Sequence, residues 1–477
     1  MSERRRYSVV RDPVHGDVYL SDEELRLLDT PQMQRLRGVR QLGTACLVYP
    51  GAQHTRFEHS LGTAHLTSRL IAAINQNRAL RPEGLLGIEK DEERILRAAA
   101  LVHDITHIPS GHNIEDVRGI LERHDTAERY LQALGPATEV GAALDKMGIR
   151  REVLAVLLPD DFDPKRAPPL PTVPACWREL LSDTICPDIL DYLKRDAYFT
   201  GLSLVYDDRI LSYFMVDRAS GHLFVDVEKR GLLREDILSE LLRVLDARYF
   251  FSERVYYHHA KVAAGAMIAQ VVETALLHGG LQREQLFDTT DHSLLALLER
   301  HVGEGADGAG GAGESNAAAA QERARARDLL ARLQTRRLLK RACVFPLYAN
   351  RDVQDELLAR FFAPGRHVER RAFEQQVADG LRRAGLEPPP LQLYCPARRM
   401  QLKEAATHVR FPGADAVAPL AKFADRVPRL GDLEKSYRDL WKLYVFAGSE
   451  EPAVLAKIAE LVAALLPKAT NVYRPRS

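Results

Sequence analysis

The chain has 477 residues, and because a single hydrophobic core stops growing at roughly 250 to 300 residues, we expect two lobes. Lysine plus arginine and aspartate plus glutamate number 66 each, so no overall field draws the protein to nucleic acid or to an anionic membrane. The five cysteines form no C-x-x-C pair, which argues against a disulfide framework or a thiolate zinc site and favours a reducing cytosol.

The N-terminal stretch MSERRRYSVV lacks the apolar segment of a signal peptide. No run of about 18 apolar residues follows it, so a transmembrane helix is not expected. We therefore predict a soluble cytoplasmic protein without a membrane partner.

The first part of the chain predicts an extended segment followed by helices. Residues 7–20 alternate in polarity and contain a proline and a glycine, which indicates a hairpin or an extended arm. Ser21 and Glu24 have the spacing of a capping box, and Thr30 before Pro31 predicts a second helix start, with Gly43 near its end. A 3.6-residue periodicity predicts further helices at 60–78, 91–106, 114–134, 177–198, 232–249 and 254–278.

The last third of the sequence predicts a different structure. Residues 303–320 are rich in glycine and alanine, which predicts a disordered loop, and residues 327–342 then resume as a helix. Beyond them ACVFPLY, LQLYCPA and KLYVFAG predict strands, with helices near 352–362, 369–384 and 452–466 between and after them. The fold class is therefore mainly α, with a body at 1–341 and a smaller α/β lobe at 342–477.

The stretch LVHDITHIPSGH, residues 101–112, places three histidines and an aspartate at the end of an apolar helix. Adjacent helical residues point about 100° apart, so His103 and Asp104 can share an ion only if other helices complete its shell. Imidazole and carboxylate ligands suit Mn, Fe, Zn or Mg with positions left open for water. One His-Asp pair is a weak signal, because a second occurs at 124–125, but more candidates lie upstream (His54, Arg56, His59) and downstream (Asp188, Asp191, Asp196).

Together these stretches resemble the HD-domain phosphohydrolases, in the branch that contains the eukaryotic SAM-and-HD-domain deoxynucleoside triphosphate triphosphohydrolase and the bacterial dGTPases. The matching segments are RDPVHGDVYL, LDTPQMQRLRGVRQLG, YPGAQHTRFEHSLGTAHL, LVHDITHIPSGH, DILDYLKRD, RVYYHHAKV and ARDLLARLQTRRLLKRA. The resemblance implies an HD-domain helical body with a short N-terminal β arm. It also implies a divalent metal ion held by His59, His103, Asp104 and Asp188.

Several histidines are candidates for the catalytic group. An ion at the predicted position would neutralise charge at phosphorus and acidify a water. His112 and Glu115 form an H-x-x-E pair suited to proton delivery to a leaving 5′-oxygen. The less favoured interpretation of Glu115 is an ordinary first-turn acid. His107 lies one turn beyond His103, and the resemblance places His124 near the same group.

The resemblance also implies a nucleotide pocket. Arg56, Arg248 and Tyr256 would hold phosphates, which guanidinium groups grip bidentately. Gln41, Leu42, Tyr192 and Asp196 would line the sugar site. The alternative interpretation is that Arg248 and Tyr256 are a surface ion-pair partner and a core ring.

Some positions depart from the family pattern. Thr106 and Ile108 replace glycines of the HD motif, Tyr257 stands where the eukaryotic enzyme has a base-contacting glutamine, and Ile189 replaces a phosphate-contacting lysine. These differences leave the base preference and the hold on the phosphates open.

Regulation is a separate expectation. Asp29, Gln34, Arg37 and Arg336 match allosteric nucleotide positions of the eukaryotic relative, in which nucleotide binding assembles a tetramer, so a homo-oligomer with a nucleotide activator is one hypothesis. A Q-x-x-R-x-x-x-Q helix is also readily structural, and Ser8 and Arg11 differ from their counterparts. Basic clusters at 4–6, 323–327 and 336–341 leave nucleic-acid binding as a minor alternative to a solvated helix face.

The leading hypothesis is a metal-dependent hydrolase that splits a dNTP into deoxynucleoside and triphosphate. A second hypothesis keeps the metal site and changes the substrate to another nucleotide or phosphoester. A third is a nucleotide-sensing or nucleic-acid-binding scaffold that performs no hydrolysis.

Overall fold

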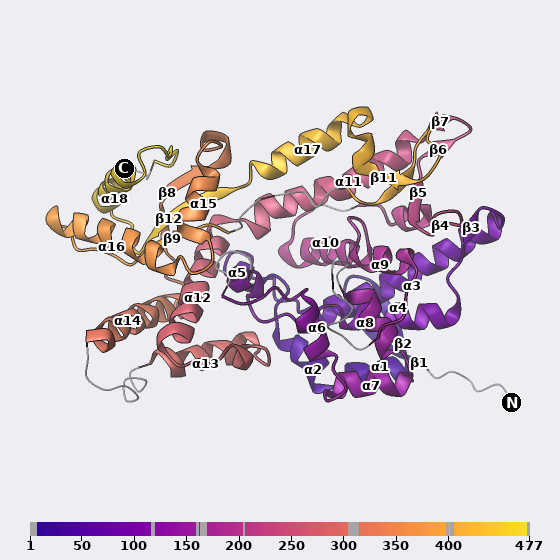
Figure 1. The fold of residues 1–477 in the computed structure, drawn as a ribbon, viewed down its shortest axis with the longest axis horizontal. Helices are drawn as coiled ribbons and strands as arrows, with labels where there is room; N and C mark the ends of the chain where they lie inside the picture. The colour runs from indigo at the N-terminus through magenta and orange to yellow at the C-terminus, as the bar shows by residue number, and fades with distance from the viewer. Residues whose placement is uncertain are drawn as a thin grey trace.

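The computed structural model describes residues 7–115, 120–158, 162, 169–203, 206–303, 314–396, 400 and 405–474. Helices make up most of the molecule, as expected for a mainly α protein. Figure 1 shows a helical body that contains the N-terminal segments and, at the other end of an elongated molecule, a smaller lobe with a three-stranded sheet. The fold class predicted from the sequence is confirmed.

The predicted N-terminal arm is a hairpin of β1 (Tyr7–Asp12) and β2 (Gly16–Ser21). Its turn is fixed by Asp12, whose Oδ1 accepts hydrogen bonds from the backbone N–H groups of Val14 and His15. Gly16 completes the turn with a φ of 81°, in the left-handed region that glycine adopts without strain. The turn carries the side chain of His15 toward the centre of the body.

The helix starts predicted from capping signals are largely present. Ser21 and Glu24 form a complete capping box at the start of α1 (Asp22–Leu28). Thr30 precedes α2 (Pro31–Arg35), but its hydroxyl donates to Leu27 O and does not cap the helix. The predicted continuation of this helix toward Gly43 is wrong, because the chain passes into two 3₁₀ turns, η1 (Leu36–Gly38) and η2 (Gly43–Leu47).

Three helices form the centre of the body. The longest, α3 (Arg56–Leu80), packs against α4 (Lys90–Val102) on one side and α10 (Pro187–Thr200) on the other. Thr55 and Glu58 form the capping box of α3. The other helices before the three-stranded sheet are α5 (Gly111–Glu115), α6 (Ala127–Ala133), α7 (Glu139–Met147), α8 (Arg150–Leu157), α9 (Ala175–Ser182), α11 (Glu235–Phe251), α12 (His259–His278), α13 (Asp291–Val302) and α14 (Glu314–Gln334). The last three lie at the end of the molecule that holds this sheet and share a core with its strands (Figure 1).

Several predicted helix boundaries are wrong, because local turns interrupt the periodic segments. The predicted helix at 114–134 is two short helices, α5 and α6, and residues 116–119 lie outside the described residues. The predicted helix at 177–198 breaks between α9 and α10, and the one at 91–106 ends at Val102. The predicted loop at 303–320 overlaps α14, which ends at Gln334 and does not reach 342; residues 304–313 lie outside the described residues.

A five-stranded sheet, not predicted from the sequence, closes one side of the body. Its order is β11-β10-β5-β4-β3, with β3 (Leu85–Leu86), β4 (Phe214–Asp217) and β5 (Leu223–Asp226) contributed by the body. The other two strands, β10 (His408–Arg410) and β11 (Ala418–Pro419), come from the C-terminal region, and β10 pairs in parallel with β5. A small separate ribbon joins β6 (Glu228–Lys229) and β7 (Leu232–Leu233).

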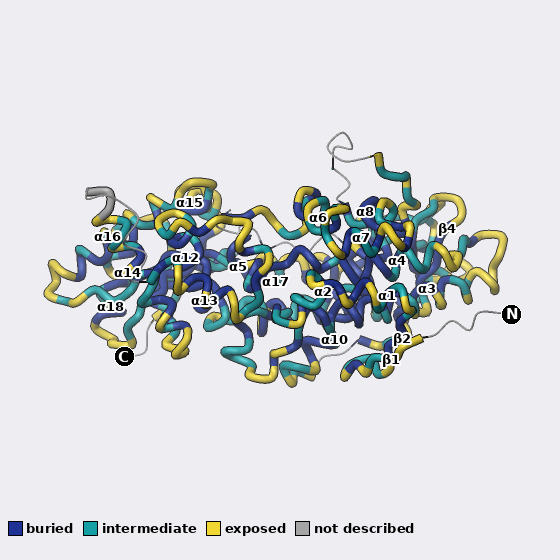
Figure 2. The backbone as a smooth tube through the Cα atoms, turned by 90° about the horizontal axis from the view of Figure 1, so that it is seen from below, coloured by how far each residue is buried: buried dark blue, intermediate teal, exposed yellow. Residues whose placement is uncertain are grey.

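The C-terminal lobe contains the three strands predicted from the sequence. They are β8 (Lys340–Pro346), β9 (Leu391–Tyr394) and β12 (Lys442–Ala447), in the order β8-β12-β9 and antiparallel throughout. Helices α15 (Gln354–Phe362), α16 (His367–Arg383) and α18 (Pro452–Leu465) accompany the sheet, and the buried residues of Figure 2 follow the middle of both lobes. Helix α17 (Pro428–Arg438) packs along α11, so part of the C-terminal region belongs to the core of the body. The division at residue 342 stays a prediction.

Among the described residues, α12 has the length and apolar composition of a membrane-spanning helix. Its most apolar window is 72% buried within the protein, against α14, α13 and the β8 strand. This burial is what a central helix of a folded core requires, and the predicted cytoplasmic location stays a prediction.

Candidate functional site

Three helices bring the predicted metal ligands together. His59 lies on α3, His103 caps the end of α4 and Asp188 lies in the first turn of α10. The Nε2 atoms of the two histidines are 3.3 Å apart, and Asp188 Oδ1 lies 2.9 Å from His59 Nε2 and 3.7 Å from His103 Nε2. Each residue offers one ligand atom within 4.8 Å of the others, the spacing of a site for a single cation.

The hydrogen bonds on the far side of each ring direct Nε2 into this cluster. His103 Nδ1 donates to Ala100 O at 2.7 Å, since a carbonyl can only accept. His59 Nδ1 faces Asp191 Oδ2 at 2.7 Å. Metal-binding histidines are held in this way, with the second nitrogen bonded to a carbonyl or carboxylate. The donor set of imidazole nitrogens and carboxylate oxygens therefore fits a divalent ion.

The pKa shifts of the cluster residues show that the site favours a positive charge. Burial lowers the pKa of His59, but hydrogen bonds to Asp188 and Asp191 outweigh burial and raise it to about 10. Burial raises the pKa of Asp188, whereas the bonds to His103 and His59 bring it below its ordinary value. The carboxylates of Asp188 and Asp191 thus favour a positive charge at His59, which its ring proton supplies, and a bound divalent ion would take the place of that proton.

Asp104, the fourth predicted ligand, is turned toward Arg56. Its Oδ2 accepts from Arg56 Nη1 at 2.6 Å, and its Oδ1 lies 3.6 Å from His103 Nε2 and 3.2 Å from His107 Nε2. Burial raises the pKa of Asp104, but the charge of Arg56, together with the contacts to His107 and His103, holds it well below its usual range. Asp104 is therefore an anion at the edge of the cluster.

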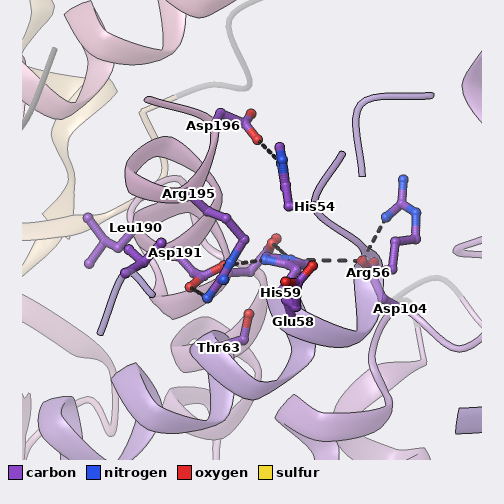
Figure 3. A network of polar contacts seen from close by, with 12 residues as sticks. His54, Arg56, Glu58, His59, Thr63, Asp104, Leu190, Asp191, Arg195 and Asp196 are labelled. Atoms are coloured by element: carbon purple, nitrogen blue, oxygen red, sulfur yellow. Dashed lines mark hydrogen bonds and ion pairs between the residues drawn. The ribbon is translucent and has the colours of Figure 1, made fainter. Parts of the chain in front are cut away.

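Asp191 lies beside His59 at the edge of the cluster, and Figure 3 shows the contact between the two side chains. Its Oδ1 accepts from His15 Nε2 at 2.7 Å and Arg195 Nη2 at 2.9 Å, and Arg195 also binds Asp12. This network is fully buried, and it connects the N-terminal hairpin to α3 and α10. A side chain at Gly62 would overlap Asp191 Oδ1, so glycine is needed where α3 approaches α10.

Three further histidines form a second group beside the cluster. The rings of His107 and His124 stack with centroids 3.6 Å apart, and that of His112 lies 5.3 Å from His107 and 5.1 Å from His124. Glu115 Oε2 accepts from the backbone N–H of His124 and lies 3.0 Å from its Nδ1. Burial lowers the pKa of both His107 and His124, so both rings are neutral near pH 7.

The cluster opens into a cavity of about 900 Å³. Asp196 lies on its wall, where Oδ2 accepts from the Tyr256 hydroxyl at 2.6 Å and Oδ1 lies 2.9 Å from His54 Nε2. Of the predicted site residues, the lining includes Gln41, Leu42, Arg56, His103, Asp104, His107, His112, His124, Asp188, Tyr192, Asp196, Arg248 and Tyr256. His59 and Glu115 lie behind this wall, both buried.

The predicted regulatory residues do not line the cavity. Arg37 lies on the surface, where its Nε donates to Gln34 Oε1 and its guanidinium stacks 3.7 Å from the centre of the Phe57 ring. Asp29 is exposed at the end of α1, and Arg336 donates to Leu47 O. The structure thus brings Gln34 and Arg37 together, and the regulatory role of all four residues stays a prediction.

Sequence reasoning gave no role to several residues that the site depends on. Asp191 was seen only as one acid of α10, and His15, Arg195 and Gly62 were not singled out. Two features of the sequence could have indicated them. Asp191 and Arg195 have the i,i+4 spacing of a helical ion pair, and Gly62 lies three residues after His59, on the same helix face.

Comparison with known proteins agrees with this geometry. Residues 56–156, which include His59, His103 and Asp104, match the family model described as HD domain. The chain therefore carries an HD domain, and the resemblance predicted from its motifs is confirmed.

The chain is similar to several curated proteins. It is 29% identical to the uncharacterised protein MJ1154 of Methanocaldococcus jannaschii over 61% of this chain and 30% identical to YwfO of Bacillus subtilis over 56%. It is 28% identical over 62% of this chain to a Dictyostelium discoideum protein described as a deoxynucleoside triphosphate triphosphohydrolase SAMHD1 homolog. The matches span about half of each relative, 54%, 55% and 56% of its length.

A crystal structure of a hypothetical protein from Aquifex aeolicus has a similar fold. It superimposes with a TM-score of 0.62 and covers 96% of this chain and 100% of that one, at 20% identity. At this identity the likeness concerns the fold alone.

Proposed function

We propose that this protein is a metal-dependent phosphohydrolase that converts a deoxynucleoside triphosphate into a deoxynucleoside and triphosphate. The observation that carries the proposal is the convergence of His59, His103 and Asp188 at a cavity lined by Arg248, with Tyr192 nearby. The SAMHD1-like relatives support this substrate class.

The ligand set favours a divalent ion, for which Mn, Fe, Mg and Zn are the candidates. Such an ion would supply positive charge to a phosphate oxygen and acidify a water. His59 and Asp188 would hold it, with His103 on a third helix and Asp104 as a neighbouring anion.

In the proposed reaction, a water oxygen forms a bond to the α-phosphorus while the bond from that phosphorus to the 5′-oxygen breaks. His112, on the cavity wall, delivers a proton to the leaving 5′-oxygen, and His107 and His124 surround it. Glu115 fixes the ring of His124.

The remaining cavity residues are suited to bind the nucleotide. Arg56 and Arg248 would grip phosphate oxygens. Asp196, held by Tyr256, would accept a hydrogen bond from the 3′-hydroxyl, and Tyr192 and Leu42 would pack against the sugar. Gln41 Oε1 is buried without a hydrogen-bond partner in the described structure, which is what a ligand-facing amide requires.

The decisive experiment is product analysis in ¹⁸O-labelled water with Mn²⁺ or Mg²⁺ and each dNTP. We expect unlabelled deoxynucleoside and triphosphate that carries one ¹⁸O. Monophosphate and pyrophosphate as the sole products would refute the proposal. His103→Ala with Asp104→Ala should abolish turnover, whereas His292→Ala, on an exposed residue of α13, should not.

A second candidate substrate class is another nucleotide or phosphoester. Two cavity residues favour it, because Tyr257 and Ile189 stand where the motifs of the resembled enzyme provide base and phosphate contacts. Turnover of another nucleotide with inert dNTPs in the same assay would select this alternative. Partner binding that survives His103→Ala with Asp104→Ala, without any turnover in the parent, would select the scaffold.

Oligomer formation and a nucleotide activator are further proposals that rest on Asp29, Gln34, Arg37 and Arg336. Sedimentation velocity with and without GTP or dGTP tests both. A shift to a larger species that Arg37→Ala removes would support them, and an unchanged sedimentation coefficient would not.

A further inference from the structure

A second group of metal-ligating side chains lies away from the HD cluster. Glu179 is on α9, His222 immediately precedes β5, and His408 is the first residue of β10. Each offers one ligand atom within 4.8 Å of the others. Residues so distant in sequence meet because β10 pairs in parallel with β5 and α9 packs on the same strand.

The two imidazoles are directed at one carboxylate. The rings of His222 and His408 stack with centroids 4.2 Å apart and an interplanar angle of 14°. Glu179 Oε1 lies 2.5 Å from His222 Nδ1 and 3.8 Å from His408 Nδ1. The other oxygen, Oε2, accepts from the backbone N–H of Leu223 at 2.7 Å, which fixes the orientation of the carboxylate.

His408 supplies an independent sign of a missing ligand. Its Nδ1 is buried and has no hydrogen-bond partner in the described part of the chain. A neutral ring keeps a lone pair on one nitrogen, and a buried lone pair facing an acid and a second imidazole is suited to bind a cation.

We propose that Glu179, His222 and His408 bind a second divalent ion, of the zinc, nickel or cobalt type. Two nitrogen ligands and one oxygen ligand favour such borderline ions over magnesium. The ion would fasten β10, and with it the C-terminal region, to α9 and the sheet of the body.

This site is next to the substrate cavity. Glu179 and His408 both line the cavity into which the HD cluster opens. Beside His408, Thr407 Oγ1 accepts from Ile185 N, and Ala406 N donates to Thr184 Oγ1. These bonds tie the strand to the loop that precedes Asp188, so an ion at His408 would steady the wall of the cavity.

Counting bound zinc tests the proposal without reference to turnover. In a His103→Ala and Asp104→Ala background, equilibrium dialysis followed by elemental analysis should still find one zinc per chain. That ion should be lost on adding His222→Gln or His408→Gln, whereas His292→Ala should leave it in place. Zinc should raise the melting temperature of this background and fail to raise that of the His408→Gln derivative.

The same count in the otherwise unchanged chain covers the case in which the double variant does not fold. There, His408→Gln should lower the number of bound zinc ions by one. An unchanged count in both His222→Gln and His408→Gln would overturn the proposal. Failure of the hydrolase proposal would instead leave these counts as expected and change only the products of turnover.

Discussion

Replacing Asp191 by asparagine tests whether this carboxylate holds His59 in position for the candidate metal site. Asp191 does not face the cavity, yet it accepts four hydrogen bonds, two from Arg195, one from His59 and one from His15. Asparagine has one acceptor oxygen, and its amide N–H groups would meet donors. His59 would then lose the bond that holds Nδ1 and directs Nε2 at Asp188.

The magnitude follows from the number of groups disturbed. Removing a partner that orients a metal-binding histidine typically weakens metal affinity about 10- to 100-fold, or about 1.4 to 2.7 kcal/mol. Arg195 keeps Asp12 but loses its second carboxylate in a fully buried position. Because breaking a buried ion pair costs about 3 to 5 kcal/mol, we expect an unfolding free energy lower by about 3 kcal/mol.

Isothermal titration of the metal-stripped protein with Mn²⁺ measures the first effect, and denaturant unfolding measures the second. Asp208→Asn is the matched control, because Asp208 also pairs with two cations, Lys194 and Arg69, but its side chain is 40% exposed. We expect the control to change either quantity little. Equal Mn²⁺ affinity of Asp191→Asn and the parent protein would refute the role of Asp191 in holding His59.

Three further outcomes follow from individual contacts. Tyr256→Phe removes the hydroxyl that binds Asp196, and we expect KM to rise about 10-fold with little change in kcat; an unchanged KM in steady-state kinetics would contradict this. Leu70→Ala opens space in the core beneath α3 and should lower the unfolding free energy by about 2 to 5 kcal/mol; a loss below about 1 kcal/mol in urea titration would argue against this packing. Burial raises the pKa of Cys176 and Cys343 to about 12. At pH 9 iodoacetamide should therefore label these thiols about two to three orders of magnitude more slowly in the folded than in the unfolded chain, and the difference should shrink toward pH 12. Equal labelling rates, measured by peptide mass spectrometry, would contradict the burial of the two thiols.

The sequence predicted those parts of the structure that have local causes. A capping box such as Ser21 with Glu24 involves two side chains three residues apart, so it is visible in the sequence and present in the structure. The three strands of the C-terminal lobe are mostly apolar runs of four to seven residues and were recognised for the same reason.

Long-range pairing was not predictable in this way. Strand β10 has three residues, and its partner β5 is about 180 residues earlier in the chain. Nothing in the tripeptide HVR indicates that it completes a sheet of the body. The breaks at Asp183 and after Val102 were missed because apolar periodicity continues through turns that tertiary contacts stabilise.

The residues of the candidate site also fall into those that a local motif predicts and those that depend on long-range contacts. His59, His103, Asp104 and Asp188 could be proposed from motifs, since each motif is a short segment. The contacts that hold these ligands in place could not be proposed from motifs. His15 reaches Asp191 only through the hairpin turn, and the lack of a side chain at Gly62 matters only because α3 meets α10 there.

The parallel pairing of β10 with β5 also sets an order of events during synthesis. At roughly 5 to 20 residues per second, a ribosome needs about 10 to 40 s to proceed from β5 to β10. Throughout that interval β5 leaves a sheet edge unpaired and open to wrong partners, a state that chaperones protect. The cavity wall that carries His408 is therefore completed only when most of the polypeptide has emerged.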